Sequence, residues 1–332
     1  MDPQVPIIDL APLIQNTSQK SEVGKALKQA CRTHGFFYVV GHGVSEDLQQ
    51  KLETLSAAFF ALPLEEKMQI RMALGGKAWR GYFPVGDELT SGKPDLKEGL
   101  YLGRETAADD PRVQAGELLM GPNLFPAALP ELGPTILEYM AAVEQVGHHL
   151  MRGLALSLDL DENFFQQHYT TDPLTLFRIF HYPPAATSTA SYWGVGEHTD
   201  YGLLTILKQD QVGGLQINSQ GQWIPAPFVP NSFICNIGDM LERMTGGYYV
   251  STPHRVLNAS GQGRFSYPFF FDPNLDAQIE PLPLPKQQTS QQTQRVRWDG
   301  KNVMAFRGTY RKYLIGKIGQ VFPDLMDEVQ DQ

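Results

Sequence analysis

The chain has 332 residues, two cysteines and a formal net charge of −9. This length allows one large domain or two. The negative charge argues against a nucleic-acid-binding surface, which is normally basic, although it leaves room for a local basic pocket. Two cysteines are too few for a disulfide scaffold, so Cys31 and Cys235 are expected to be reduced and buried thiols.

The sequence predicts neither a secretory signal at its N-terminus nor a membrane span. The N-terminus M-D-P-Q-V-P-I-I-D-L lacks a basic stretch followed by an apolar run. No uninterrupted apolar run approaches the ~20 residues of a membrane span. We therefore expect a cytoplasmic protein without a membrane or nucleic-acid partner, either a monomer or a weak homo-oligomer.

The first third of the chain reads as helical after a short strand near residues 5–10. Apolar residues between 21 and 34 recur with the spacing of one helical face, and Gly35 follows as a stop signal. The dense run F-F-Y-V-V at 36–40 predicts a strand. A second helix is expected from Ser45 to about Leu62, where Pro63 ends it.

The middle and the end of the chain differ from the first third in the secondary structure that they predict. Glycines and prolines between 75 and 130 predict long loops with short strands, and a strong helix is expected at 133–158. Residues 281–294 are low in complexity and predict an exposed loop, and 303–318 predicts a closing helix. Short strands separated by turn residues are typical of a sandwich or jelly roll, and they are expected at 174–182, 202–208, 214–218, 223–225, 232–236, 251–257 and 264–271.

A candidate metal site lies in E-H-T-D-Y and P-H-R-V. His198 and Asp200 are two residues apart, so on a strand both side chains would share a face. His254 would have to come from a distant strand. Two imidazoles and one carboxylate suit iron(II) with open coordination positions, but manganese and zinc accept the same ligands.

A candidate anion receptor follows in G-R-F-S-Y. Arg264 and Ser266 are also two residues apart on a predicted strand, and a guanidinium with a hydroxyl is a good receptor for a carboxylate. Tyr182, at the end of the strand F-R-I-F-H-Y, could reach the same anion. An arginine paired with a structural acid and a tyrosine in the core remain the alternatives.

These motifs, in this order and spacing, resemble the isopenicillin N synthase-like family of 2-oxoglutarate- and iron(II)-dependent dioxygenases. The resemblance covers most of the chain. It includes C-R-T-H-G-F-F-Y-V-V-G-H-G-V at 31–44, H-Y-P-P at 181–184, V-G-G-L-Q-I at 212–217, N-I-G-D at 236–239 and S-T-P-H-R-V at 251–256. Each block is modestly specific, and their joint occurrence is highly specific.

The resemblance implies a mainly β fold with α-helices: a double-stranded β-helix, or jelly roll, with a helical N-terminal region and a C-terminal helix. It implies an N-terminal region at 1–125 that continues into 126–332, with the jelly-roll core at about 172–275, all in one compact unit. His198, Asp200 and His254 would hold Fe(2+). Arg264 and Ser266, helped by Tyr182, would bind the far carboxylate of 2-oxoglutarate.

The activity implied is hydroxylation or desaturation of a small-molecule metabolite with O2, releasing succinate and CO2, with ascorbate as a supporting reductant. The chain departs from many relatives at Phe180 and His181, where they carry Asn and Tyr, and at Gly41, where they carry Asn. His42 beside it reads as structural. Weaker candidates for the substrate pocket are Phe269, Phe271, Tyr192, Trp193, Arg178 and Tyr82, the last in a loop that could form a lid.

Three other functions stay open at this point. One is an iron(II) oxidase of the same fold that does not consume 2-oxoglutarate, in which Arg264 and Ser266 bind the carboxylate of the substrate itself. The second is a jelly-roll binding protein without activity. The third is a zinc hydrolase, which would need a general base that the sequence does not offer. The identity of the substrate is not encoded in any of these motifs.

Overall fold

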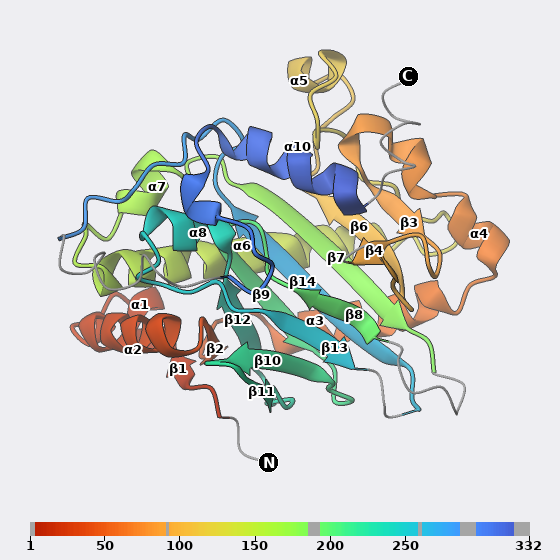
Figure 1. Ribbon diagram of the computed structural model, residues 1–332. Helices are drawn as coiled ribbons and strands as arrows, with labels where there is room; N and C mark the ends of the chain where they lie inside the picture. Colours follow the sequence, from red (N-terminus) through yellow and green to blue (C-terminus); the bar gives the residue numbers. More distant parts are fainter. Residues whose placement is uncertain (1–3, 91–92, 185–192, 258–260, 286–296, 322–332) are drawn as a thin grey trace.

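The architecture comes from a computed structural model, which describes residues 4–90, 93–184, 193–257, 261–285 and 297–321. Two sheets form a jelly roll (Figure 1). The main sheet holds, in spatial order, β1 (Ile7–Asp9), β2 (Phe36–Val40), β12 (Phe233–Ile237), β9 (Leu204–Gln209), β14 (Arg264–Asp272), β7 (Leu174–Tyr182), β6 (Glu98–Gly103) and β3 (Gly81–Phe83). The smaller sheet holds β11 (Gln222–Pro225), β10 (Leu215–Ser219), β13 (His254–Leu257) and β8 (Trp193–His198). The short strands β4 (Leu89–Thr90) and β5 (Lys93–Pro94) form a separate antiparallel pair.

Helices cover the outer face of the main sheet. Figure 1 shows α6 running behind the sheet with α2 beside it, and α10 crossing at the opposite side. The helices are α1 (Ala11–Ile14), α2 (Lys20–Thr33), α3 (Glu46–Phe60), α4 (Leu64–Met68), α5 (Pro111–Gln114), α6 (Leu132–Ser157), α7 (Phe164–His168), α8 (Asp239–Met244) and α10 (Tyr310–Val321), with 3-10 segments at Met72–Ala78 and Val303–Ala305. Ser45 caps α3 by accepting a hydrogen bond from the backbone N–H of Leu48, as its position in the sequence predicts.

The alternation of side chains along β14 separates the core from the interior of the roll. Phe269 and Phe271 are fully buried on the face toward α6, where Gly147 leaves room for the ring of Phe271. Arg264, Ser266 and Phe270 lie on the other face, which lines a cavity. Because the side-chain period of a strand is two, a single strand supplies both the packed core and the wall of the site.

Most predicted elements are confirmed, two of them with the same bounds, namely the strands at 36–40 and 174–182. The closing helix at 303–318 was wrong in its first part. Residues 303–305 form a 3-10 turn, and α10 begins only at Tyr310, because Gly308 adopts a φ of 134° that interrupts a helix. The loop predicted at 281–294 lies mostly outside the described residues.

Two further expectations concern the cysteines and the membrane. Cys31 and Cys235 are free and buried, as expected, and burial raises the pKa of both thiols. Among the described helices, none has the length together with the apolar composition that crossing a bilayer requires.

Candidate metal centre and the cavity around it

Sheet pairing brings the two histidines together. His198 ends β8 and His254 begins β13, and these residues are direct partners in the antiparallel register. Their ring centroids lie 4.2 Å apart. Two imidazoles that are 56 residues apart in the sequence therefore lie side by side on adjacent strands.

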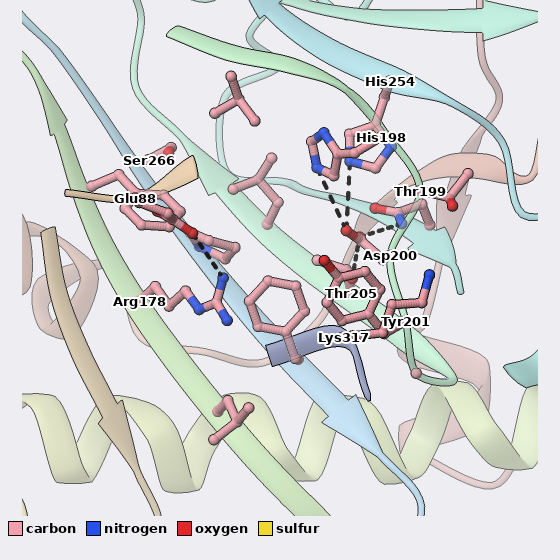
Figure 2. Close-up of a pocket in the computed structure, with 18 of the residues that line it drawn as sticks. Glu88, Arg178, His198, Thr199, Asp200, Tyr201, Thr205, His254, Ser266 and Lys317 are labelled. Atoms are coloured by element: carbon pink, nitrogen blue, oxygen red, sulfur yellow. Dashed lines mark hydrogen bonds and ion pairs between the residues drawn. The ribbon is translucent and has the colours of Figure 1, made fainter. Parts of the chain in front are cut away.

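Asp200 completes the group from a loop rather than from a strand. β8 ends at His198, so the expectation of two ligands on one strand was wrong. Asp200 Oδ1 nevertheless lies 3.8 Å from His198 Nε2 and 3.7 Å from His254 Nε2 (Figure 2). One ligand atom from each of the three residues lies within 4.8 Å of the others. Atoms spaced in this way can share one metal ion.

Hydrogen bonds orient each of the three groups. Asp200 Oδ2 accepts hydrogen bonds from Thr205 Oγ1 (2.5 Å) and Asn236 Nδ2 (2.7 Å), which leaves Oδ1 turned toward the histidines. His198 Nδ1 lies 2.8 Å from the carbonyl oxygen of Gly196, and His254 Nδ1 lies 3.2 Å from that of Thr252. A carbonyl oxygen can only accept, so each Nδ1 carries the proton and each Nε2 offers its lone pair to a metal.

The protonation states suit metal binding. Burial, reinforced by the neighbouring His198, lowers the pKa of His254 to about 4, so this imidazole is neutral near pH 7. Burial opposes ionisation of Asp200, but the two histidines and the hydrogen bonds from Asn236 and Thr205 hold its pKa below the ordinary value. The site therefore offers two imidazole nitrogens and one carboxylate, which is the ligand set of non-haem iron(II) oxygenases.

Arg264 is buried, and no hydrogen-bond acceptor for it is found among the described residues. Its side chain is 1% exposed, and Nε, Nη1 and Nη2 all lack a hydrogen-bond acceptor among the described residues. Arg264 is the register partner of Tyr182, and its guanidinium lies 4.7 Å from the centre of the Tyr182 ring. Ser266 Oγ donates a hydrogen bond to the Tyr182 hydroxyl at 3.4 Å. Because a buried unpaired charge costs several kcal/mol, this guanidinium is suited to binding an anion that enters the cavity.

The metal group and the arginine face one cavity of about 600 Å³. This volume falls in the usual range for small-molecule sites. Its wall includes the side chains of Arg178, Phe180 and Tyr182, which alternate along β7 as their spacing predicts. The cavity can therefore hold a small dicarboxylate beside the metal and a second small molecule.

Three of the weaker candidates, Phe269, Phe271 and Tyr82, lie outside the cavity. Phe269 and Phe271 belong to the core against α6 and not to the cavity. Tyr82 is in β3 rather than in a lid loop; it is 1% exposed and donates a hydrogen bond of 2.6 Å to Glu98. Trp193 is the first residue of β8, and Tyr192 lies outside the described residues. His42 is buried, and its Nδ1 accepts a hydrogen bond from the Val44 backbone.

Other residues at the site were missed from the sequence. Asn236 was noted only as part of the block N-I-G-D, and Thr205 only as a strand residue, although both bind Asp200. Glu88 and Lys97 line the cavity from a stretch that was read only as loops and short strands. Lys317 and Tyr201 line it from α10 and from the residue after Asp200. Spacing within one element could not reveal contacts made between elements.

Comparison with known proteins agrees with this geometry. Residues 5–128 match the family model described as non-haem dioxygenase in morphine synthesis N-terminal, and residues 166–273 match the 2OG-Fe(II) oxygenase superfamily. A probable iron/ascorbate oxidoreductase of Dictyostelium discoideum is 47% identical over 98% of this chain and 97% of its own length. A 1-aminocyclopropane-1-carboxylate oxidase of Dictyostelium mucoroides is 38% identical over 97% of this chain and 96% of its own.

Among solved structures, a full-length protein of Neurospora crassa, crystallised in complex with alpha-KG and thymine, superposes with a TM-score of 0.79. It is 27% identical, and the match covers 95% of this chain and 96% of its own. Together these matches place the chain in the 2OG-Fe(II) oxygenase superfamily, to which it belongs. The protein is thus an oxidoreductase that uses Fe(2+), 2-oxoglutarate and O2 and acts on a small molecule.

Proposed function

We propose that His198, Asp200 and His254 hold the iron, and that Arg264, Ser266 and Tyr182 bind the far carboxylate of 2-oxoglutarate. The observation that carries this assignment is the buried guanidinium of Arg264, which has no acceptor among the described residues although it lines the cavity of the metal ligands. A planar guanidinium matches a carboxylate through two parallel hydrogen bonds. The metal group fits iron(II) because its donors are two imidazoles and one carboxylate.

When bound, iron supplies the activation of O2 that lets 2-oxoglutarate be decarboxylated while the substrate is oxidised. The residues of the chain do the positioning. Thr205 and Asn236 fix the Asp200 carboxylate, and the backbone carbonyls of Gly196 and Thr252 fix the two imidazoles. The products are a hydroxylated or desaturated metabolite, succinate and CO2. A role for ascorbate is supported by the name of the Dictyostelium discoideum oxidoreductase.

The region at 1–125 and the remainder at 126–332 form one compact unit in this proposal. In support of it, β2 pairs with β12, and β6 pairs with β7, so strands of the first region complete the main sheet of the second. The enzyme works in the cytoplasm in this proposal, a location that suits both its free thiols and an iron(II) cofactor.

The alternative against which this function is tested is a reaction that does not consume 2-oxoglutarate, because the chain is also similar to 1-aminocyclopropane-1-carboxylate oxidases of Dictyostelium. Oxygen uptake is measured with and without 2-oxoglutarate, in the presence of iron(II), ascorbate and a panel of small metabolites. Uptake that requires 2-oxoglutarate and yields equal amounts of succinate supports the first function. Uptake that is independent of 2-oxoglutarate supports the oxidase.

The variant Asp200→Ala tests the metal assignment. It is expected to lose stoichiometric iron binding and succinate release, because it removes the only charged ligand. Asp47→Ala, which removes an exposed carboxylate in the first turn of α3, serves as the control and should keep both. Iron content is measured by metal analysis, independently of turnover. An Asp200→Ala protein with a full complement of iron would contradict the assignment.

A further inference from the structure

The cavity contains a second arginine, and its surroundings differ from those of Arg264. Arg178 lies in the middle of β7 and lines the cavity with a side chain that is 24% exposed. In Figure 2 it lies across the pocket from Asp200. Its guanidinium makes no hydrogen bond with the residues that the structure describes, and its one ion pair, with Glu88 Oε1, is 3.7 Å long.

Glu88 has closer partners than Arg178. Its Oε1 accepts a hydrogen bond of 2.5 Å from the Tyr101 hydroxyl, and its Oε2 lies 2.8 Å from Lys97 Nζ. Lys97 also pairs with Asp95. The cluster thus contains two cations, Lys97 and Arg178, and two anions, Glu88 and Asp95. It is neutral before any ligand arrives, so the folded protein tolerates Arg178 while the N–H donors of this arginine stay available.

Aromatic rings hold the guanidinium in place. Its central carbon lies 4.1 Å from the centre of the Tyr101 ring and 4.8 Å from that of Phe270. Such contacts orient a guanidinium without using its hydrogen-bond donors. The guanidinium of Arg178 therefore presents a preorganised, planar set of N–H donors to the cavity. Apolar side chains such as those of Leu176 and Phe180 line the cavity beside it.

From this arrangement we propose that Arg178 binds the carboxylate of the oxidisable substrate, which makes the substrate class a small carboxylic acid. Its carbon skeleton then lies along the apolar wall toward His198, Asp200 and His254. Arg264 stays reserved for the cosubstrate, since Arg264 and Arg178 lie on different strands and Arg264 is out of solvent while Arg178 is not. This inference rests on the proposed function, because it assumes that the metal group is the reacting centre.

The test compares carboxylic acids with uncharged analogues of the same shape. Iron-loaded enzyme with 2-oxoglutarate and ascorbate is given α-amino acids and aliphatic and aromatic monocarboxylic acids, each beside its primary amide. Succinate release is measured, and binding is measured without oxygen by the fluorescence of Trp79 and Trp298, which line the cavity. We expect at least one acid to stimulate release and its amide to do so at least about 10-fold less well, because the amide leaves the charged donor unpaired.

The variant Arg178→Gln should lower kcat/KM for that acid at least about 10-fold, mostly through KM, whereas Arg178→Lys should be intermediate because it keeps the charge and loses the planar fork. N-oxalylglycine, an unreactive analogue of 2-oxoglutarate, should bind to the Arg178→Gln protein as it binds to the wild type, because its far carboxylate is assigned to Arg264. The control is Arg32→Gln, which removes an exposed arginine seated 4.8 Å from the Tyr248 ring, outside the cavity. A structural role for Arg178 would change the unfolding midpoint and not the preference for acid over amide.

The results separate the two proposals. Acids and amides that act equally well, a panel in which no acid acts, or an Arg178→Gln enzyme that keeps the full preference would each overturn the role of Arg178. In all three cases the wild-type protein would still bind N-oxalylglycine in the presence of metal. A wild-type protein that fails to bind this analogue would instead overturn the proposed function.

Discussion

At the scale of single residues, Arg264 and Asp200 are held in opposite ways. Asp200 has two hydrogen-bond donors on one oxygen and two imidazoles near the other. Arg264 has no acceptor among the described residues, although it is 1% exposed. The carboxylate of Asp200 is already oriented by hydrogen bonds in the protein without ligands, whereas the donors of the Arg264 guanidinium are available to a ligand. This difference is expected when one residue holds a resident metal and the other binds a cosubstrate that leaves after each turnover.

The substitution Arg264→Lys tests the role of the guanidinium. It keeps a positive charge but removes the planar pair of donors, so the dissociation constant of N-oxalylglycine should rise about 10-fold or more. Binding is measured by titration calorimetry on metal-loaded protein. Iron content should stay that of the wild type, because Arg264 contributes no ligand to the metal. Unchanged affinity for the analogue would mean that its carboxylate binds elsewhere.

At the scale of elements, the packing of α6 on β14 depends on one glycine. A Cβ at Gly147 would lie 2.4 Å from the ring of Phe271, which is fully buried. The substitution Gly147→Ala should therefore destabilise the protein by about 1–3 kcal/mol, the usual cost of overpacking a core. The free energy of unfolding is measured with urea.

The matched control for this prediction is Gly316→Ala in α10. A Cβ there meets nothing within 4 Å, and the residue is exposed. Alanine favours a helix over glycine by roughly 0.5–1 kcal/mol, so the same substitution should have the opposite sign. Equal effects at the two positions would show that helix propensity, and not contact with Phe271, decides the outcome at Gly147.

The contact between α10 and β14 should make stability depend on pH. Asp272 Oδ2 accepts a hydrogen bond of 2.5 Å from the Tyr310 hydroxyl, and Oδ1 accepts one of 3.3 Å from the Leu203 N–H. Burial raises the pKa of Asp272 from 3.8 to about 7, although these hydrogen bonds oppose the rise. Between those pH values the folded protein keeps a proton that the unfolded chain releases. This contribution to stability is therefore complete below pH 3.8 and is lost as the pH rises through about 7.

The substitution Asp272→Asn fixes this side chain in a neutral form. In the wild type, the ionisation of Asp272 should lower the free energy of unfolding by up to about 1.4 kcal/mol per pH unit between pH 4 and 7. In the variant, this part of the slope should be absent. Unfolding in urea at several pH values gives both slopes. Parallel curves for the wild type and the variant would show that Asp272 ionises normally in the folded protein.

At the scale of the whole molecule, ligands should stabilise the fold in a fixed order. In the proposed site, one end of 2-oxoglutarate or its analogue N-oxalylglycine binds the metal and the other end binds Arg264. Metal-free protein prepared with a chelator should therefore have the lowest Tm, metal should raise it, and N-oxalylglycine should raise it further only when metal is present. At a ligand concentration 100 times Kd, each binding event adds about 2.7 kcal/mol of stability. An equal rise with the analogue alone would mean that it binds without the metal.

Local patterns determined much of the fold and of the candidate site. The run F-F-Y-V-V specified β2, and the alternation in L-T-L-F-R-I-F-H-Y specified β7, because strand propensity and a period of two act within a few residues. The types and spacing of His198, Asp200 and His254 pointed to a metal before any geometry was known. Arg264 and Ser266 were found for the same reason, as two polar residues on one face of one strand.

Only the tertiary structure decided how these segments meet. The pairing of β13 with β8 placed His254 opposite His198, and a loop rather than a strand supplied Asp200. Contacts between elements also decided that Thr205 and Asn236 support Asp200, that Tyr82 is buried instead of covering the cavity, and that Arg178 keeps free donors above two rings. Sequence spacing constrains neighbours along the chain, whereas the environment of a charged group depends on distant residues that only the completed sheets bring beside it.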